Sequence, residues 1–207
     1  FKMLCGLLQP SEGSARVVGL DLQNAPSKAR GRIGYMAQKF SLYGDLSVQQ
    51  NLDFFAGVYG LTGKSRKDAI SQMIETFGFA DRLDVNAMGL PLGYKQRLAL
   101  ACAVMHEPDV LFLDEPTSGV DPRTRREFWT HINAMVANGV TIMVTTHFLD
   151  EAEYCDRMAL IYRSKMIASG SPDELKDRAR ASGMMDPTLE DAFIALVEQS
   201  DREREAG

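Results

Sequence analysis

The residues best suited to chemistry are two adjacent carboxylates, Asp114 and Glu115, which follow a run of apolar residues. Residues 110–113 have the composition of a buried parallel strand, and such strands deliver the next residues to the carboxyl edge of a sheet, where α/β proteins bind ligands. Asp114 is suited to hold Mg²⁺, often through water, and Glu115 is suited to take a proton from an attacking water molecule. A buried strand that ends in polar residues is also common, so the pair alone leaves a purely structural role open.

Other candidate residues lie at the ends of predicted strands or the starts of predicted helices. In chain order they are Gln38, Gly93, Tyr94, Ser118, Asp121 and His147. Three of them have an alternative interpretation. A glutamine in a turn is normally solvated, and Asp121 before Pro122 is typical of a helix start. His147 and Glu151, four residues apart, would supply only two ligands to a metal, which is too few for a good site.

The elements that must position these residues alternate between strands and helices over much of the chain. Strands are predicted at residues 14–19, 32–37, 110–113, 140–145, 157–162 and 165–168, and helices at 122–137, 147–154, 172–181 and 188–199. This alternation implies a mostly parallel sheet with right-handed crossovers. Residues 1–8 are predicted to be the tail of a helix, and the charged residues 201–207 are predicted to be frayed.

The block from residue 39 to residue 106 has a helical pattern instead. Ser47 is expected to cap one helix and Ser65 a second, and residues 93–105 form a third that is rich in Leu and Ala. The apolar face of the first helix is predicted to carry Leu52, Phe55, Val58 and Tyr59, and that of the second Ile70, Met73, Ile74 and Phe77. The block therefore reads as a helical subdomain inserted into the sheet-forming core.

Length and composition exclude several classes of protein. The 207 residues, 45% of them hydrophobic, suffice for one sizeable core, and the net charge of −5 has no long basic block, so no nucleic-acid partner is expected. The longest apolar run, residues 98–105, is far shorter than the ~20 residues that span a bilayer. The three cysteines, Cys5, Cys102 and Cys155, are widely spaced in apolar surroundings, which is typical of buried thiols in a reducing, cytoplasmic compartment.

Five motifs in this order and spacing make the chain resemble the ATP-binding-cassette (ABC) ATPase domain. They are Gln38, the helix start at Gly93-Tyr-Lys-Gln-Arg97, the pair Asp114-Glu115, the segment Ser118-Gly-Val-Asp121, and Thr145-Thr-His147. The resemblance covers essentially the whole chain. It implies an α/β, P-loop NTPase-like fold with a mostly parallel sheet, in which residues 1–38 and 107–207 form a partial ATPase core and residues 39–106 the inserted helical subdomain.

The same resemblance implies a role for each candidate residue, with ATP and Mg²⁺ as cofactors. Asp114 is the Walker B acid that holds Mg²⁺, and Glu115 is the catalytic base. Gln38 is the Q-loop glutamine that touches Mg²⁺ or the attacking water, and His147 is the switch histidine that contacts the γ-phosphate. Ser118 and Asp121 belong to the D-loop, which crosses to a second ATPase domain. Gly93 and Tyr94 belong to the signature segment, which in this family faces nucleotide held by the other domain.

The chain departs from the family pattern in two places. It contains no glycine-rich loop ending in Gly-Lys-Ser/Thr to cradle phosphates, and we expect that loop and the first strand to lie upstream of Phe1, so that the 207 residues alone bind ATP poorly. The signature, Leu-Ser-Gly-Gly-Gln in the family, reads Leu90-Pro-Leu-Gly-Tyr94 here. Pro91 has neither a hydroxyl nor an amide hydrogen, and Leu92 adds bulk, so we expect the partner's nucleotide site to be the weaker one.

The resemblance also implies partners. These are a second ABC ATPase domain, identical or different and in tandem or separate, and a transmembrane permease, which would hold the chain at the cytoplasmic face of the membrane. Residues 40–46 are expected to help form a groove for a helix of the permease. The alternative is that Leu42 and Leu46 simply pack beneath the subdomain. Residues 92–97 and 188–193 look like the drug-exporter branch, and also like ribosome-associated tandem ATPases. An exporter ATPase is therefore the main hypothesis, and a ribosome-associated ATPase that transports nothing is the alternative.

Overall fold

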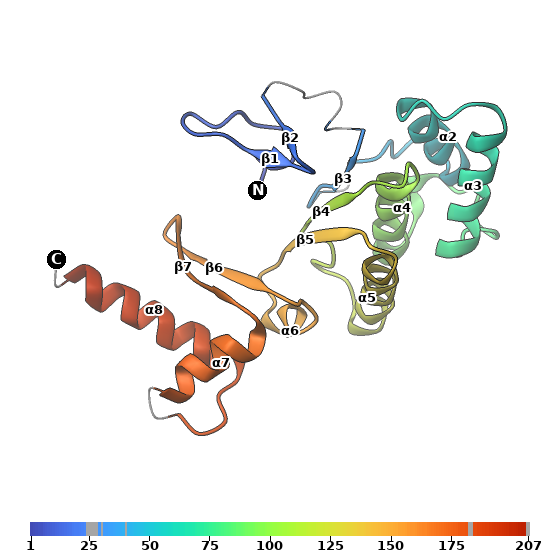
Figure 1. Ribbon diagram of the computed structural model, residues 1–207. Coiled ribbons are helices and arrows are strands. Elements are labelled where there is room, and N and C mark those ends of the chain that lie inside the picture. The colour runs from blue at the N-terminus through green and yellow to red at the C-terminus, as the bar shows by residue number, and fades with distance from the viewer. Residues whose placement is uncertain (24–28, 30, 40, 182–183, 206–207) are drawn as a thin grey trace. The chain divides into compact units, whose positions relative to one another are not determined.

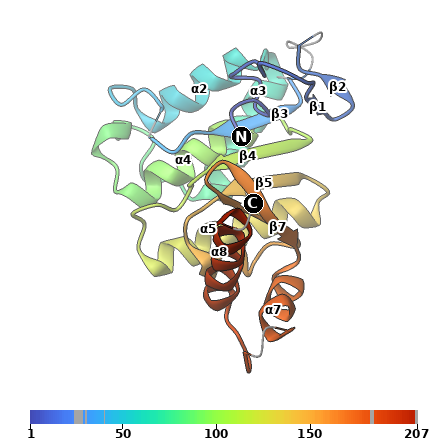
Figure 2. The ribbon, with the colours of Figure 1, turned by 90° about the vertical axis from the view of Figure 1, so that its left-hand side faces the viewer.

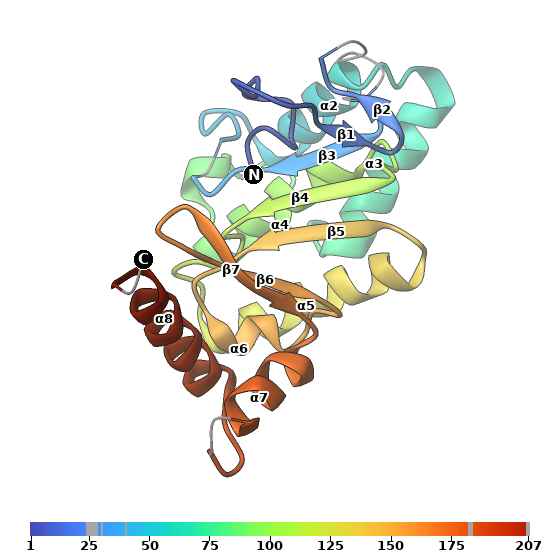
Figure 3. The same cartoon turned by 60° about the vertical axis from the view of Figure 1, so that its left-hand side comes forward.

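The computed structural model describes residues 1–23, 29, 31–39, 41–181 and 184–205, and the chain divides into two compact units, residues 1–145 and 146–207. The first unit contains a three-stranded parallel sheet in the order β3–β4–β5. Its strands are β3 (Ile33–Met36), β4 (Val110–Asp114) and β5 (Thr141–Thr145), which lie side by side in Figure 3. The predicted parallel sheet is therefore confirmed, with strand ends within about one residue of those expected.

Among the described residues between β3 and β4 there are three α-helices and a short 3-10 helix. They are α2 (Val48–Val58), α3 (Gly63–Phe77), η1 (Ala87–Gly89) and α4 (Leu92–Val104). Helices α2, α3 and α4 pack on one another, and α4 also packs on β3 (Figure 1). Helix α5 (Pro122–Ala137) then connects β4 to β5 and packs on both α4 and β5. The boundaries of the predicted helical subdomain, residues 39–106, stay a prediction.

Two details of these helices differ from the sequence prediction. Val58 is 60% exposed, because the buried face of α2 is formed by Val48, Asn51, Leu52 and Ala56. Helix α3 begins at Gly63, so Ser65 lies inside it and does not cap it; the Ser65 hydroxyl donates instead to the carbonyl oxygen of Thr62. The expected face of α3 is correct in its main members, since Ile70, Met73 and Phe77 are all buried.

The start of the chain forms turns and a small hairpin, where a helix tail and one strand were predicted. Between residues 1 and 8 only the Cys5 amide makes a helix-like bond, to the Phe1 carbonyl oxygen; the next bonds have other spacings, so no helix forms. The predicted strand at residues 14–19 is instead two antiparallel strands, β1 (Arg16–Val17) and β2 (Leu20–Asp21). The residues between them, Val18 and Gly19, both have positive φ, which suits a tight hairpin turn.

In its described residues, the second unit consists of an antiparallel hairpin and three helices. The hairpin is β6 (Met158–Tyr162) and β7 (Lys165–Gly170), and the helices are α6 (Leu149–Ala152), α7 (Pro172–Ala181) and α8 (Leu189–Glu205). Helices α7 and α8 lie next to each other (Figure 2). The unit has its own apolar core, formed by Ala152, Leu160, Ala168, Leu175 and Leu189.

The end of α8 also differs from the prediction, because residues 201–205 are helical and not frayed. Asp201 accepts a hydrogen bond from the Tyr162 hydroxyl, 3.1 Å away, which ties this part of α8 to the hairpin. Residues 206–207 of the predicted frayed end lie outside the described residues. Of the three cysteines, Cys5 and Cys102 are buried as expected, whereas Cys155 is only half-buried. No helix in the described part of the chain is both long and apolar enough to cross a bilayer.

Candidate functional site

The register of the parallel sheet brings three of the candidate segments to one edge. Met36 at the end of β3 pairs with Leu113, and Asp114 at the end of β4 pairs with Thr145 at the end of β5. Gln38 follows β3 by two residues and is exposed, and Glu115 follows β4 directly. Gln38, Asp114 and Glu115 therefore lie at the same carboxyl edge of the sheet, which is where open α/β sheets bind ligands.

Asp114 is half-buried and is held by its neighbour on β5. The Thr145 hydroxyl donates to Asp114 Oδ1 over 2.6 Å, a short distance typical of a hydrogen bond to a charged oxygen. The Asp114 charge also affects the pKa of two nearby groups. Burial, with a smaller contribution from the Asp114 charge, raises the pKa of the Cys5 thiol to about 11. Burial and then Asp114 raise the pKa of Tyr35 in the same way. Asp114 thus gives this edge a negative potential that suits a cation.

Glu115 has a backbone conformation that is rare for its residue type. Its φ is +45°, in the left-handed region, and conformations of this kind cluster at functional sites because the surroundings must hold them in place. The Glu115 amide donates to both oxygens of Thr145, the carbonyl at 2.9 Å and the hydroxyl at 3.2 Å. The Ser118 amide donates to the Glu115 carbonyl oxygen at 3.2 Å, so Ser118 lies in the turn that starts at Glu115.

Thr145 is the residue of this site whose contacts the sequence analysis missed. Its hydroxyl bonds the Asp114 carboxylate and the Glu115 amide together, so it joins the two acids to β5. The signal that points to it is register. When two parallel strands of five residues end at the same edge, the last residue of one faces the last residue of the other.

Asp121 caps helix α5, as its position before Pro122 predicts. Its carboxylate accepts from the amides of Arg123 and Thr124, at 3.1 and 3.0 Å. A hydrogen bond from the Thr124 side chain, followed by the bonds from these amides, holds the Asp121 pKa below its usual value. Asp121 is therefore an exposed, ionised group at the start of a helix.

The signature segment packs against the start of α5. Pro91 is the cap residue of α4 and makes no side-chain capping bond, and Leu92 is exposed. A methyl group at Gly93 would overlap Thr124 Cγ2, so a larger residue here would force the Thr124 side chain to shift. Two cations lie close to the Tyr94 ring, with the Arg82 guanidinium 4.5 Å and that of Arg97 5.2 Å from its centre. Gly93 and Tyr94 therefore both make close contacts with other residues of this chain.

Two further residues, Arg97 and His106, hold the structure around these segments. Arg97 on α4 forms an ion pair with Glu127 on α5, which joins the two helices below Tyr94. His106 stacks on Tyr59 with ring centres 3.7 Å apart, and one ring nitrogen lies 3.2 Å from the Ile33 carbonyl oxygen. Burial lowers the pKa of His106, which favours its neutral form.

His147 belongs to the second unit and is described there by itself. It is exposed, and its ring lies 4.1 Å from that of Phe148. Glu151 is 1% exposed and accepts a hydrogen bond from the Thr146 hydroxyl. Across the described residues no three His, Cys, Asp or Glu side chains are grouped so that they could hold a metal ion by themselves.

The fold, the acidic sheet edge and the comparison with known sequences together define the family. The chain belongs to the ABC transporter family, whose model matches residues 1–118. The chain is similar to the probable multidrug ABC transporter ATP-binding protein YbhF of Escherichia coli K12, with 62% identity over 203 residues. The matched region covers 98% of this chain but 35% of YbhF. The chain thus spans about a third of that relative's length.

A second relative and two solved structures agree with this assignment. The Nod factor export ATP-binding protein I of Paraburkholderia xenovorans LB400 is 33% identical over 208 residues, covering 97% of this chain and 68% of the relative. The structure of an ATP binding subunit of an ABC transporter has a TM-score of 0.82 at 27% identity, over 95% of this chain and 81% of that one. CbiO1 of Clostridium perfringens, part of the ABC transporter complex cbiONQ, has a TM-score of 0.75 at 28% identity. The match covers 87% of this chain and 75% of CbiO1.

Proposed function

We propose that the chain is the part of a membrane exporter that hydrolyses ATP, with Glu115 as the general base for the attacking water. The observation that carries this proposal is the pair Asp114 and Glu115 at the carboxyl edge of a parallel sheet, fixed by the Thr145 hydroxyl and amide bonds. The relatives support export: one is named as a probable multidrug transporter protein and another as a Nod factor export protein. Neither is named as a ribosomal factor, so the comparison favours export over the ribosome-associated alternative.

The residues at this edge suit Mg²⁺ bound with a nucleotide. The carboxylate of Asp114 and the amide oxygen of Gln38 are hard oxygen donors, and a nucleotide-bound Mg²⁺ needs only one or two such protein ligands beside phosphates and water. When bound, Mg²⁺ would neutralise charge on the phosphates. Asp114 would hold it, Gln38 would orient it or the water, and Ser118 would lie beside the nucleotide. His147 would donate a hydrogen bond to the γ-phosphate.

A second ATPase domain completes the proposed site. Gly93 and Tyr94 would face nucleotide held by that second domain, and Asp121 would cross the interface near it. The start of α4 provides partial positive charge for a phosphate. The contacts of Gly93 with Thr124 and of Tyr94 with two arginines show that these residues also fix the helix start within the chain.

The proposed partner in the membrane would dock on an exposed apolar patch in the first unit. We define this docking patch as Tyr43, Phe54 and Met88, which are 50, 41 and 65% exposed. The rings of Tyr43 and Phe54 are 4.7 Å apart, and the Met88 amide donates to the Gly44 carbonyl oxygen, so the three lie together. Leu42 and Leu46 are only half-buried, and Phe40 lies outside the described residues. Docking here would hold the chain at the cytoplasmic face.

The test of the proposed activity is Glu115→Gln in the assembled transporter. We expect ATP to bind as before while kcat falls by about 10²–10⁴, the usual contribution of a general base. Glu107→Gln, at an exposed position before the other end of β4, is the matched control and should leave kcat unchanged. If Glu115→Gln and Glu107→Gln hydrolyse ATP at the same rate, Glu115 is not the base and the proposed mechanism is wrong.

A further inference from the structure

Glu151 is the buried acid that the proposed mechanism leaves unexplained. It lies on α6, a helix of four residues, and its side chain is 1% exposed. A buried carboxyl group costs free energy unless it is hydrogen-bonded, and a helix this short has little stability of its own. An alanine at this position would form the same short helix without that cost. The acid must therefore be explained by what it contacts.

The contacts of Glu151 enclose the segment that carries His147. The Thr146 hydroxyl donates to Glu151 Oε2 over 2.7 Å, and the same hydroxyl oxygen accepts from the Phe148 amide over 3.0 Å. The Glu151 amide donates to the Phe148 carbonyl oxygen over 3.1 Å. The residues before and after His147 are thus bonded to each other and to Glu151, while the His147 ring is left exposed.

We propose that Thr146 and Glu151 form a clasp that positions His147 for its contact with the γ-phosphate. The inference rests on the proposed function, and it assigns a positioning role to two residues, neither of which touches ATP. A histidine on a loop can donate to a phosphate only if the loop holds its ring within about half an ångström of the productive place. Three hydrogen bonds over six residues supply that restraint, and the buried anchor prevents water from competing for them.

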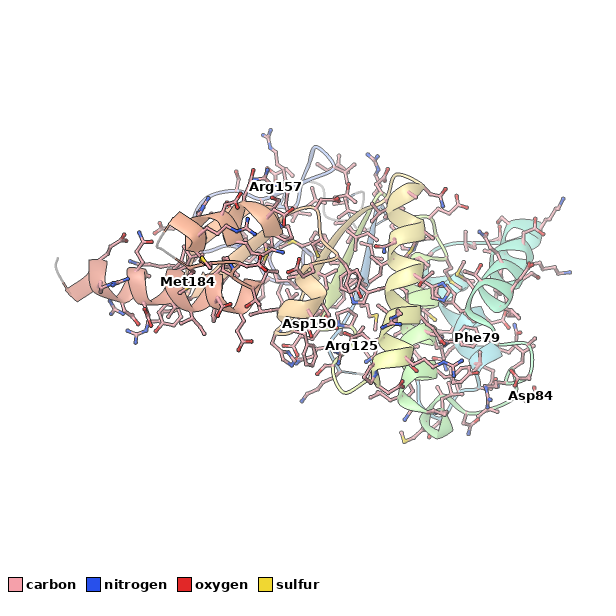
Figure 4. All side chains as sticks on the ribbon, turned by 90° about the horizontal axis from the view of Figure 1, so that it is seen from below. Phe79, Asp84, Arg125, Asp150, Arg157 and Met184 are labelled. Atoms are coloured by element: carbon pink, nitrogen blue, oxygen red, sulfur yellow. The ribbon has the colours of Figure 1, made fainter. Side chains whose placement is uncertain are left out.

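The clasp is tested in the assembled transporter by isosteric pairs. Thr146→Val keeps the shape and removes the hydroxyl, whereas Thr146→Ser keeps the hydroxyl; Glu151→Gln keeps an acceptor for it. We expect Thr146→Val to lower kcat about tenfold to a hundredfold, as misplacing a catalytic group does, with the KM for ATP nearly unchanged. Thr146→Ser and Glu151→Gln should retain most of the wild-type kcat. Asp150→Asn, at an exposed neighbour on α6 labelled in Figure 4, is the control and should have no effect.

His147→Ala separates failure of the clasp from failure of the proposed function. If His147→Ala lowers kcat but Thr146→Val matches the wild type, the clasp proposal is overturned and the role of His147 stands. If His147→Ala itself leaves kcat unchanged, both are overturned. A purely structural role for Thr146 would appear as a lower Tm in Thr146→Val with kcat unchanged well below that Tm, and it would also overturn the clasp.

Discussion

At the scale of single residues, the site depends on how a threonine hydroxyl connects two acids. Thr145 Oγ1 donates to Asp114 and accepts from the amide of Glu115, so one oxygen atom uses both of its hydrogen-bonding capacities. Glu115 needs this support because its φ of +45° is unfavourable for a residue with a side chain. The position of Glu115, the proposed catalytic base, is therefore set partly from the neighbouring strand.

Removing this hydroxyl should weaken the fold and the activity together. We expect Thr145→Val to lower the free energy of unfolding by about 1–3 kcal/mol, because Asp114 is half-buried and loses a charged hydrogen bond. The matched control is Thr141→Val, at the exposed first residue of the same strand, which should change stability by less than about 0.5 kcal/mol. Urea denaturation measures the free energy of unfolding of both variants. Equal losses in the two variants would mean that the Thr145 hydroxyl has no special role.

At the scale of elements, two serines show how caps decide where helices begin. Ser47 caps α2 in a reciprocal arrangement: its hydroxyl oxygen accepts from the Gln50 amide, and its own amide donates to the Gln50 side chain. Buried Asn51, one residue further on, donates to the carbonyl oxygens of Tyr43, Leu46 and Ser47. The loop before α2 is thus fixed to the helix that follows it.

We expect Ser47→Ala to lower the free energy of unfolding by about 1 kcal/mol, since it removes the cap of α2. Ser65→Ala removes a similar hydroxyl from an exposed position inside α3, where no cap is lost, and should cost only a few tenths of a kcal/mol. Thermal unfolding followed by circular dichroism compares the two variants. A larger loss for Ser65 than for Ser47 would contradict this account of the caps.

At the scale of the whole molecule, the docking patch is the surface at which we propose that the membrane partner binds. Its residues come from the loop before α2, from α2 itself and from η1, so three elements contribute to it. Exposed apolar groups that cluster in this way are typical of surfaces that bind another protein. The Asn51 bonds keep the patch in one shape.

Charge on this patch should separate docking from folding. We expect Tyr43→Glu to abolish co-purification with the membrane partner while Tm changes by no more than about 2 °C, because half of the Tyr43 side chain is exposed. Val136→Glu, at an exposed apolar position on α5, is the control and should leave docking intact. A large fall in Tm with normal docking would instead mean that Tyr43 packs beneath the helices.

How much could be predicted from the sequence depended on whether the signal was local. The apolar run before Asp114 predicted β4, and Asp121 before Pro122 predicted the start of α5, because a strand pattern and a helix cap are both written in neighbouring residues. The edge that gathers Gln38, Asp114 and Glu115 followed from the parallel topology alone. The proposed roles of these residues came from the family resemblance.

What could not be predicted depended on contacts between distant residues. The end of α8 looked frayed because its charges have no local apolar partners, but Tyr162 holds Asp201 from the hairpin. The contacts of Thr145 could be found only from the register of β4 and β5. Nothing in the sequence indicated that Glu151 would be buried and hydrogen-bonded to Thr146. The turn at Val18 was missed because a valine with positive φ is uncommon.

The contact of Gly93 with Thr124 has a mechanical consequence. Because the starts of α4 and α5 touch with no side chain of Gly93 between them, neither end can tilt toward the other, and the Arg97–Glu127 ion pair resists their separation. A displacement of residues 91–93 is therefore expected to move Asp121, the cap of α5. The two helix starts that we propose to face a second ATPase domain are therefore expected to move together within one chain.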